Sequence, residues 1–170
     1  DSSYTLYHAV QQGLRPLAVH FDNGWNSKIA VKNIQNICEK LKIDLYTYVV
    51  DWEEFKDLQI SFLKASVSDA EIPTDIGIIS TLIKTAAKEN IKYILEGHSF
   101  RTEFVMPIGC TYMDGRYIKS VHEKFGSKKL KSYPNFTVWD MILNNIIKGV
   151  KIIQFPDYCD YEKDKAKEIL

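Results

Sequence analysis

Three short polar segments follow apolar runs that are typical of buried strands. They are residues 20–26, residues 50–52 and residues 96–103. In open parallel sheets, ligands bind beyond the carboxyl ends of the strands. Within the third segment, Gly97 would let the main chain approach a phosphate closely, and Glu103 offers the oxygen ligand that Mg²⁺ prefers. These exits therefore predict a phosphate and magnesium site at one edge of a sheet.

The helices and strands that must form this edge alternate along the chain. The sequence predicts helices over residues 3–13, 27–41, 52–65 and 76–89, with Ser27 as a cap and Gly13 as a terminator. Strands are predicted over residues 16–21, 44–50 and 93–95, the last one after a turn at Asn90. Alternating strands and helices are typical of an α/β fold with a parallel sheet covered on both faces.

The pattern changes after about residue 108, which predicts a domain over residues 1–108 and an α-rich extension over residues 109–170. Glycines and prolines punctuate the extension, and helices are expected only over residues 137–147 and 161–170. The extension is expected to serve a site or an interface more than the sheet. Its aromatic residues could form that interface or ordinary core: Tyr112, Tyr117, Phe125, Tyr133, Phe136 and Trp139.

Charge and cysteine content narrow the function classes. The chain has 22 Lys and Arg against 22 Asp and Glu, so no long-range field favours nucleic acid or an anionic membrane as partner. Its apolar runs are too short to cross a bilayer. Cys38, Cys110 and Cys159 fit neither a disulfide framework nor a zinc site. We expect a soluble, cytoplasmic protein that binds neither nucleic acid nor membrane.

Several candidate residues also have a structural interpretation. Asp22 could bind a ligand or accept donors in its own turn. Glu71, Thr74 and Asp75 could start a helix with Pro73 in its first turn, and a helix N-terminus also attracts anions.

For the other candidate residues, the sequence favours a functional role in some cases and a structural role in others. His98 leaves a strand at the ligand edge, so function is favoured there, whereas His8 and His122 are expected at the surface or in packing. Trp25 is the tryptophan favoured for ligand contact. For Arg101 and Arg116 a salt bridge is the default and a bidentate anion contact the alternative. Residues 128–131, rich in lysine, are expected to form a solvated loop.

Five blocks of the sequence resemble the PP-loop ATP pyrophosphatases, and within them the N-acetyl sugar amidotransferases of surface-polysaccharide and nonulosonic acid biosynthesis. The resemblance covers nearly the whole chain, and several blocks are peculiar to the amidotransferase branch. The blocks are FDNGWNS (21–27), DWEEFKDLQ (51–59), FLKASV (62–67), AEIPTD (70–75) and RYIK (116–119).

The resemblance implies an adenine nucleotide alpha hydrolase-like, Rossmann-like fold, with three α/β/α layers and five parallel core strands. In that family a central strand precedes a phosphate loop of the form Ser-Gly-Gly-Xaa-Asp-Ser. Only Asp1 and Ser2 match the end of that loop. We therefore expect a longer natural protein, and a gap in the middle of the sheet of this chain.

The implied activity is an AMP-forming ligase reaction on an N-acetylated sugar, free or nucleotide-linked. The acetamido oxygen is adenylated by ATP, and ammonia then gives an acetamidino group. The implied cofactors are ATP and Mg²⁺, and the implied partners are the sugar and a separate glutaminase. The sequence leaves both a monomer and a homo-oligomer open. Alternatives are a PP-loop tRNA-modifying enzyme of thiolation or lysidine type, and a catalytically inactive nucleotide-binding module.

The resemblance also assigns roles to residues. Asp1 and Glu103 would hold magnesium and act in catalysis with His98. The residues implied in binding ATP are Ser2, Phe21, Asp22, Asn23, Gly24 and Gly97. Those implied in binding the sugar are Trp25, Glu71, Thr74, Asp75, Arg101 and Arg116.

Overall fold

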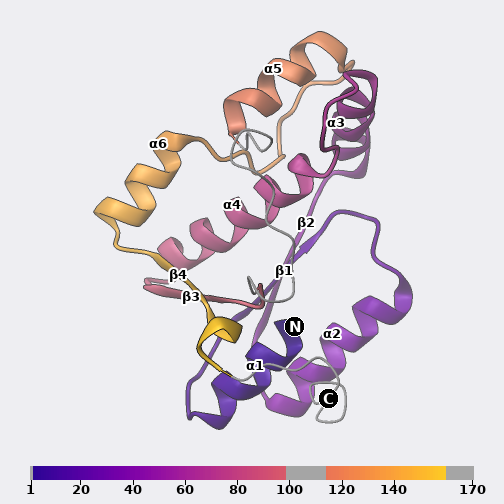
Figure 1. Cartoon of the computed structure of the whole chain (residues 1–170). Coiled ribbons are helices and arrows are strands. Elements are labelled where there is room, and N and C mark those ends of the chain that lie inside the picture. The colour runs from indigo at the N-terminus through magenta and orange to yellow at the C-terminus, as the bar shows by residue number, and fades with distance from the viewer. Residues whose placement is uncertain (1, 99–113, 160–170) are drawn as a thin grey trace.

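A computed structural model describes residues 2–98 and 114–159, which fold as alternating helices and strands (Figure 1). Short 3-10 and π helices, η2 and η1, occur near the C-terminal end of the described part. The elements are α1 (Ser2–Gln11), β1 (Ala18–Asp22), α2 (Lys28–Leu41), β2 (Leu45–Val49), α3 (Trp52–Lys64), α4 (Ile72–Lys88), β3 (Tyr93–Glu96), α5 (Gly115–Phe125), α6 (Val138–Met141), η1 (Ile142–Ile147), β4 (Lys151–Gln154) and η2 (Phe155–Tyr158).

The strands of the described residues form two separate parallel pairs. β1 pairs with β2 from Ala18 opposite Leu45 onward, and helix α2 makes the crossover that a parallel pair requires. β3 pairs with β4, with Tyr93 opposite Lys151. The α/β class with parallel strands is confirmed, but in these ranges the strands do not form one continuous sheet.

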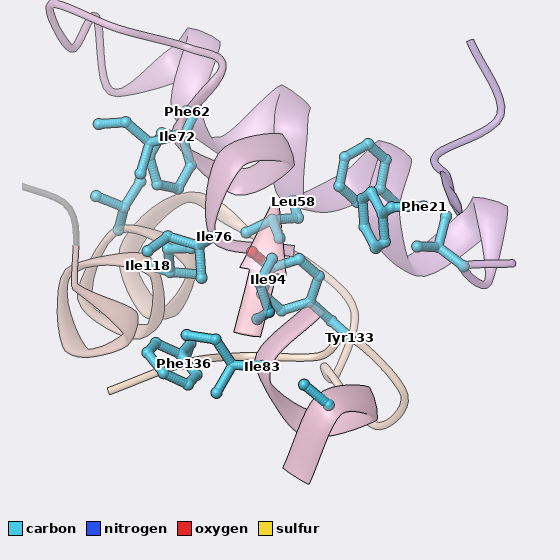
Figure 2. Packing of buried hydrophobic residues seen from close by; sticks show 14 of the residues in the cluster. Phe21, Leu58, Phe62, Ile72, Ile76, Ile83, Ile94, Ile118, Tyr133 and Phe136 are labelled. Carbon is cyan, nitrogen blue, oxygen red and sulfur yellow. The ribbon is translucent and has the colours of Figure 1, made fainter. Parts of the chain in front are cut away.

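One hydrophobic core joins the two strand pairs to the C-terminal part (Figure 2). Helix α4 contacts both β1 and β3, because its apolar face carries Ile72, Ile76 and Ile83 at helical spacing. Helix α3 adds Phe62, which is fully buried, and burial of such a side chain stabilises the fold by roughly 1.5–3 kcal/mol. The rest of the cluster comes from all parts of the chain and includes Phe21, Phe55, Leu58, Ile94, Ile118, Tyr133, Phe136 and Val150.

Local capping sets the helix boundaries that the sequence predicted. Ser27 Oγ accepts the Ala30 N–H at 3.1 Å at the start of α2, and the side chain of Asp51 caps α3 in the same way. Helix α4 begins at Ile72, earlier than residue 76, with Pro73 in its first turn. The alternative in which residues 71–75 start a helix is therefore confirmed.

The prediction for the C-terminal part was wrong in two places. Helix α5 forms although it begins at Gly115, because Asp114 Oδ1 accepts the Arg116 N–H at 2.9 Å and caps it. Gly115 itself donates its N–H to the Phe136 carbonyl at 2.8 Å. Strand β4 belongs to a sheet, so this part contributes to the strands as well as to the surface. The predicted helix over residues 161–170 lies outside the described residues.

The predicted helix over residues 137–147 is confirmed, with a π-helical second half. Thr137 and Asp140 form a reciprocal capping box at its start. Asn144 Nδ2 donates to the Asp140 carbonyl at 2.7 Å, which competes with the usual α-helical bond to that oxygen. Trp139, Ile146 and Ile147 are more than 70% exposed, so Trp139 is not a core residue. None of the helices in the described ranges has the length and apolar character needed to span a bilayer.

Candidate functional site

The loop after β1 is a tight turn held by Asp22. Asp22 Oδ1 accepts the Gly24 N–H at 3.0 Å and the Asn26 amide at 3.4 Å. Gly24 has a φ of 82°, and a Cβ at this position would lie 2.6 Å from the Trp52 ring. The turn interpretation of Asp22 therefore holds, and glycine is required at position 24 both for its backbone angle and for the approach of the indole.

The ring of Phe21 belongs to the core. It is 8% exposed and stacks on Tyr48 with ring centroids 6.1 Å apart. On the other side it lies against Gly77, where a Cβ would come within 2.4 Å of the ring. Only the main chain of Phe21 is left to face a nucleotide.

The loop after β1 contacts the first turn of α4. Asn23 Nδ2 donates to Thr74 Oγ1 at 3.5 Å. The half-buried Asp75 follows, and its carboxyl has a raised pKa, first because of burial and then because of the nearby charges of Asp69 and Glu71. The charge of His98 acts in the opposite direction. The residues that leave β1 and β3 therefore meet at the N-terminal end of α4.

The end of β3 also contacts the start of α1. Gly97 is buried, and a Cβ at this position would lie 2.5 Å from the main-chain nitrogen of Ser2 and 2.8 Å from Ser2 Oγ. A side chain larger than hydrogen would therefore push the first turn of α1 away. The close approach brings the N-terminal turn of a helix next to the end of a strand.

The predicted site residues other than Phe21, Asp22 and Gly24 divide into three groups. Eight lie along this edge and the groove beside it: Ser2, Asn23, Trp25, Glu71, Thr74, Asp75, Gly97 and His98. Arg116 lies at the start of α5, where its Nε donates to Asp114 Oδ2 at 2.8 Å, the salt bridge expected by default. Asp1, Arg101 and Glu103 lie outside the described residues. Within the described ranges, no three His, Cys, Asp or Glu side chains are grouped to hold a metal ion.

A groove of about 480 Å³ opens between the loop after β1, helix α3 and the segment before α4. Trp25 and Trp52 meet edge to face in it, with ring centroids 5.5 Å apart and planes at 75°. Lys56 and Gln59 of α3 also line it. Lys56 and Gln59 were not predicted as site residues, although their spacing from Trp52 places all three on one helical face.

A second polar cluster lies on another face of α3. The buried Asp57 accepts the Ser127 hydroxyl at 2.6 Å, the Lys128 N–H at 2.9 Å and a bond to His122 Nε2 at 2.9 Å. Burial alone would raise the pKa of Asp57, but these hydrogen bonds hold the pKa well below its ordinary value. The carboxylate stands between the serine and the histidine, so the serine has no histidine base and the cluster is structural.

Glu54 anchors the rest of the same loop. It accepts the main-chain N–H groups of Lys131, Ser132 and Tyr133, the last at 3.0 Å. The Tyr133 hydroxyl then donates to the Pro73 carbonyl in the first turn of α4 at 2.7 Å. The expectation of a solvated loop at residues 128–131 was therefore wrong for the main chain, although the lysine side chains are exposed. The loop fixes the position of the α4 N-terminus at the candidate site.

No protein-family model matches the sequence, and no curated protein is significantly similar to it.

Proposed function

We propose that this chain is the nucleotide-binding part of an ATP-dependent, AMP-forming amidotransferase that acts on an N-acetylated sugar in the cytoplasm. The finer fold in this proposal is the PP-loop, Rossmann-like one. Parallel strand pairs and a helix over both of them support it, and the separation of the pairs in the described residues is a departure from the family pattern.

The observation that carries the proposal is the convergence of two strand exits on two helix N-termini. Ser2 at the start of α1 lies against Gly97 after β3. Asn23 after β1 bonds to Thr74 in the first turn of α4. Helix N-termini carry a partial positive charge, which suits the oxygens of a triphosphate. The missing Cβ at Gly97 lets the first turn of α1 lie directly against the end of β3.

The acidic groups near α4 bear on the role of magnesium. Asp69 and Glu71 lie close enough to Asp75 to raise its pKa, and the three carboxylates would repel a free polyphosphate. A Mg²⁺ ion bound with the nucleotide would offset that repulsion. In the proposal Asp1 and Glu103 hold the ion, and the acidic group only adds favourable charge around it.

The proposed reaction needs activation of an inert amide. ATP supplies it by adenylating the acetamido oxygen with release of pyrophosphate, and ammonia then displaces AMP. The protein must hold the two reactants in line and keep water from the activated carbon. His98 is exposed and its charge acts on the Asp75 carboxyl, so we assign His98 the role of accepting the proton that ammonia loses on addition. A separate glutaminase would supply ammonia in the cell.

The test is AMP and pyrophosphate release by the full chain with Mg²⁺, ATP and an ammonium salt. The salt replaces the glutaminase. We expect release in equal amounts only when an N-acetylated nucleotide sugar is present, and a loss of about 10²-fold or more in His98→Ala. Release that needs transfer RNA and no sugar would overturn the proposal in favour of a tRNA-modifying enzyme. Nucleotide binding without any release of AMP would overturn it in favour of a catalytically inactive nucleotide-binding module.

A further inference from the structure

The groove between Trp25 and Trp52 lies beside the proposed nucleotide edge and is not needed to bind phosphate. Its volume of about 480 Å³ falls in the range of small-molecule sites. Its base and walls are mainly apolar, with Ile60, Leu63 and Ala70 next to the two indoles. Asn23, Lys56, Gln59 and Glu71 add polar groups to this apolar lining, a combination that is usual in ligand pockets.

Trp25 is exposed and yet fixed in position. Its side chain is 66% exposed, while its Nε1–H donates to Gln59 Oε1 at 2.6 Å and its main-chain N–H donates to Asn23 Oδ1 at 3.2 Å. Since the indole N–H already has a partner, the free part of the ring is apolar. An exposed aromatic ring that is held in one orientation is preorganised for contact with a flat or half-apolar ligand.

The polar groups of the groove favour a neutral ligand with many hydroxyl groups. Lys56 supplies donors, Glu71 supplies acceptors and Asn23 supplies both. One face of a sugar ring consists of C–H groups. Their hydrogens carry a small positive charge, which suits the electron-rich face of an indole. Its hydroxyl and acetamido groups can both donate and accept. A phosphate group would be attracted by Lys56 but repelled by Glu71, so the groove is less suited to it.

The groove shares residues with the proposed site of reaction. Asn23 lines the groove and bonds to Thr74, and Glu71 lines the groove and stands immediately before α4. A ring in the groove could therefore extend a substituent toward the first turn of α4, where Asp75 and His98 lie. We infer that the Trp25–Trp52 groove holds the acceptor sugar ring and directs its acetamido group toward this edge. The identity of the ligand rests on the proposed function.

The test uses tryptophan fluorescence of the full chain during titration with N-acetylglucosamine and N-acetylmannosamine. Trp139 is exposed on α6, away from the groove lining, so Trp139→Phe provides both a cleaner signal and the matched control. We expect saturable emission changes in the starting protein and in Trp139→Phe, and at least tenfold weaker binding in Trp25→Ala. The urea midpoint of Trp25→Ala should stay close to that of the starting protein.

Other results would overturn the inference. Sugar binding that is unchanged in both Trp25→Ala and Gln59→Leu would place the sugar elsewhere. Competition between AMP and the sugar for the same emission change, lost in Trp25→Ala, would make the groove the adenine site. Nucleotide binding is measured separately by calorimetry. Sugar binding at the groove without any ATP binding would refute the proposed function and support the groove as a saccharide site.

Discussion

Helix α3 has polar side chains on two of its faces, and they are in opposite situations. On one face Glu54 and Asp57 are buried, and main-chain and hydroxyl donors of residues 127–133 surround their carboxylates. On the other face Trp52, Lys56 and Gln59 line an open groove. The carboxylates on the first face form their hydrogen bonds within the protein, whereas the side chains on the second face leave surface exposed to a ligand.

The difference shows how a single sequence block can carry two roles. Buried carboxylates that collect several donors fix a loop, because an unpaired donor or charge in the interior costs much free energy. The position of the exposed Trp25 ring, in contrast, contributes little to the stability of the fold. We therefore expect substitutions on the buried face to change stability strongly, and substitutions in the groove to change ligand binding.

The largest expected effect is on the buried face. Asp57→Ala leaves the Ser127 and Lys128 donors without their acceptor, so we expect a loss of about 3–5 kcal/mol in the free energy of unfolding. Urea denaturation followed by circular dichroism measures it. Glu53→Ala is the matched control, because Glu53 bonds Lys128 at the exposed surface, and it should change stability little. Equal losses in the two variants would show that the buried face is not the structural one.

A pH titration tests the same carboxylate without relying on truncation. The pKa of Asp57 is lower in the folded state than in the unfolded state. Its stabilisation is therefore fully present above the ordinary aspartate pKa of about 3.9, and is lost as the pH falls through the folded-state pKa. We expect urea midpoints to decrease from pH 5 downward, and less steeply in Asp57→Asn. An identical slope in Asp57→Asn would contradict the assignment.

A comparison of alanine variants at two glycines separates the cost of backbone strain from the cost of disturbing the groove. Gly13 and Gly24 both have positive φ, but a Cβ meets nothing within 4 Å at Gly13 and meets the Trp52 ring at Gly24. Gly13→Ala should cost about 1–2 kcal/mol from the left-handed conformation alone. Gly24→Ala should cost more and should also weaken sugar binding. If both variants lose the same stability and keep full binding, the packing of Gly24 on Trp52 has no role in the groove.

The smallest expected effect concerns the link between the two regions. Tyr133→Phe removes the hydrogen bond to the Pro73 carbonyl, and we expect a loss of about 0.5–1.5 kcal/mol in the free energy of unfolding. Because this bond positions the first turn of α4, nucleotide binding should weaken measurably, while the sugar titration of the groove should change less. A stronger effect on the sugar than on the nucleotide would reverse the proposed placement of the two ligands.

Periodicity and capping predicted much of the N-terminal half. Ser27, Asn90 and the apolar runs mark their elements clearly, because local conformation and burial agree there. Helix α5 and strand β4 were missed because Gly115 resembles a break and the four residues of β4 are too short for a pattern. Both depend on partners that are distant in the sequence, such as the Phe136 carbonyl for Gly115.

The candidate site was predictable in part for similar reasons. The strand exits pointed to Asn23, Gly97 and His98, since the topology of parallel strands places exits at one edge. The groove was missed because its α3 residues are polar and aromatic and look like an ordinary exposed helical face. The loop at residues 128–131 was misjudged because the bonds to Glu54 and Asp57 use main-chain N–H groups, which the side-chain sequence does not reveal.

The pairing of β3 with β4 sets the order in which the molecule can be assembled during synthesis. Tyr93 emerges from the ribosome well before its partner Lys151, and Val150 closes the core next to it. Until β4 is made, β3 lacks the strand with which it pairs in the described part of the chain, and an unpaired strand edge is a place where nascent chains associate wrongly. A ribosome stalled before residue 150 should therefore hold a protease-sensitive chain in which β1 and β2 can pair but β3 cannot yet pair with β4.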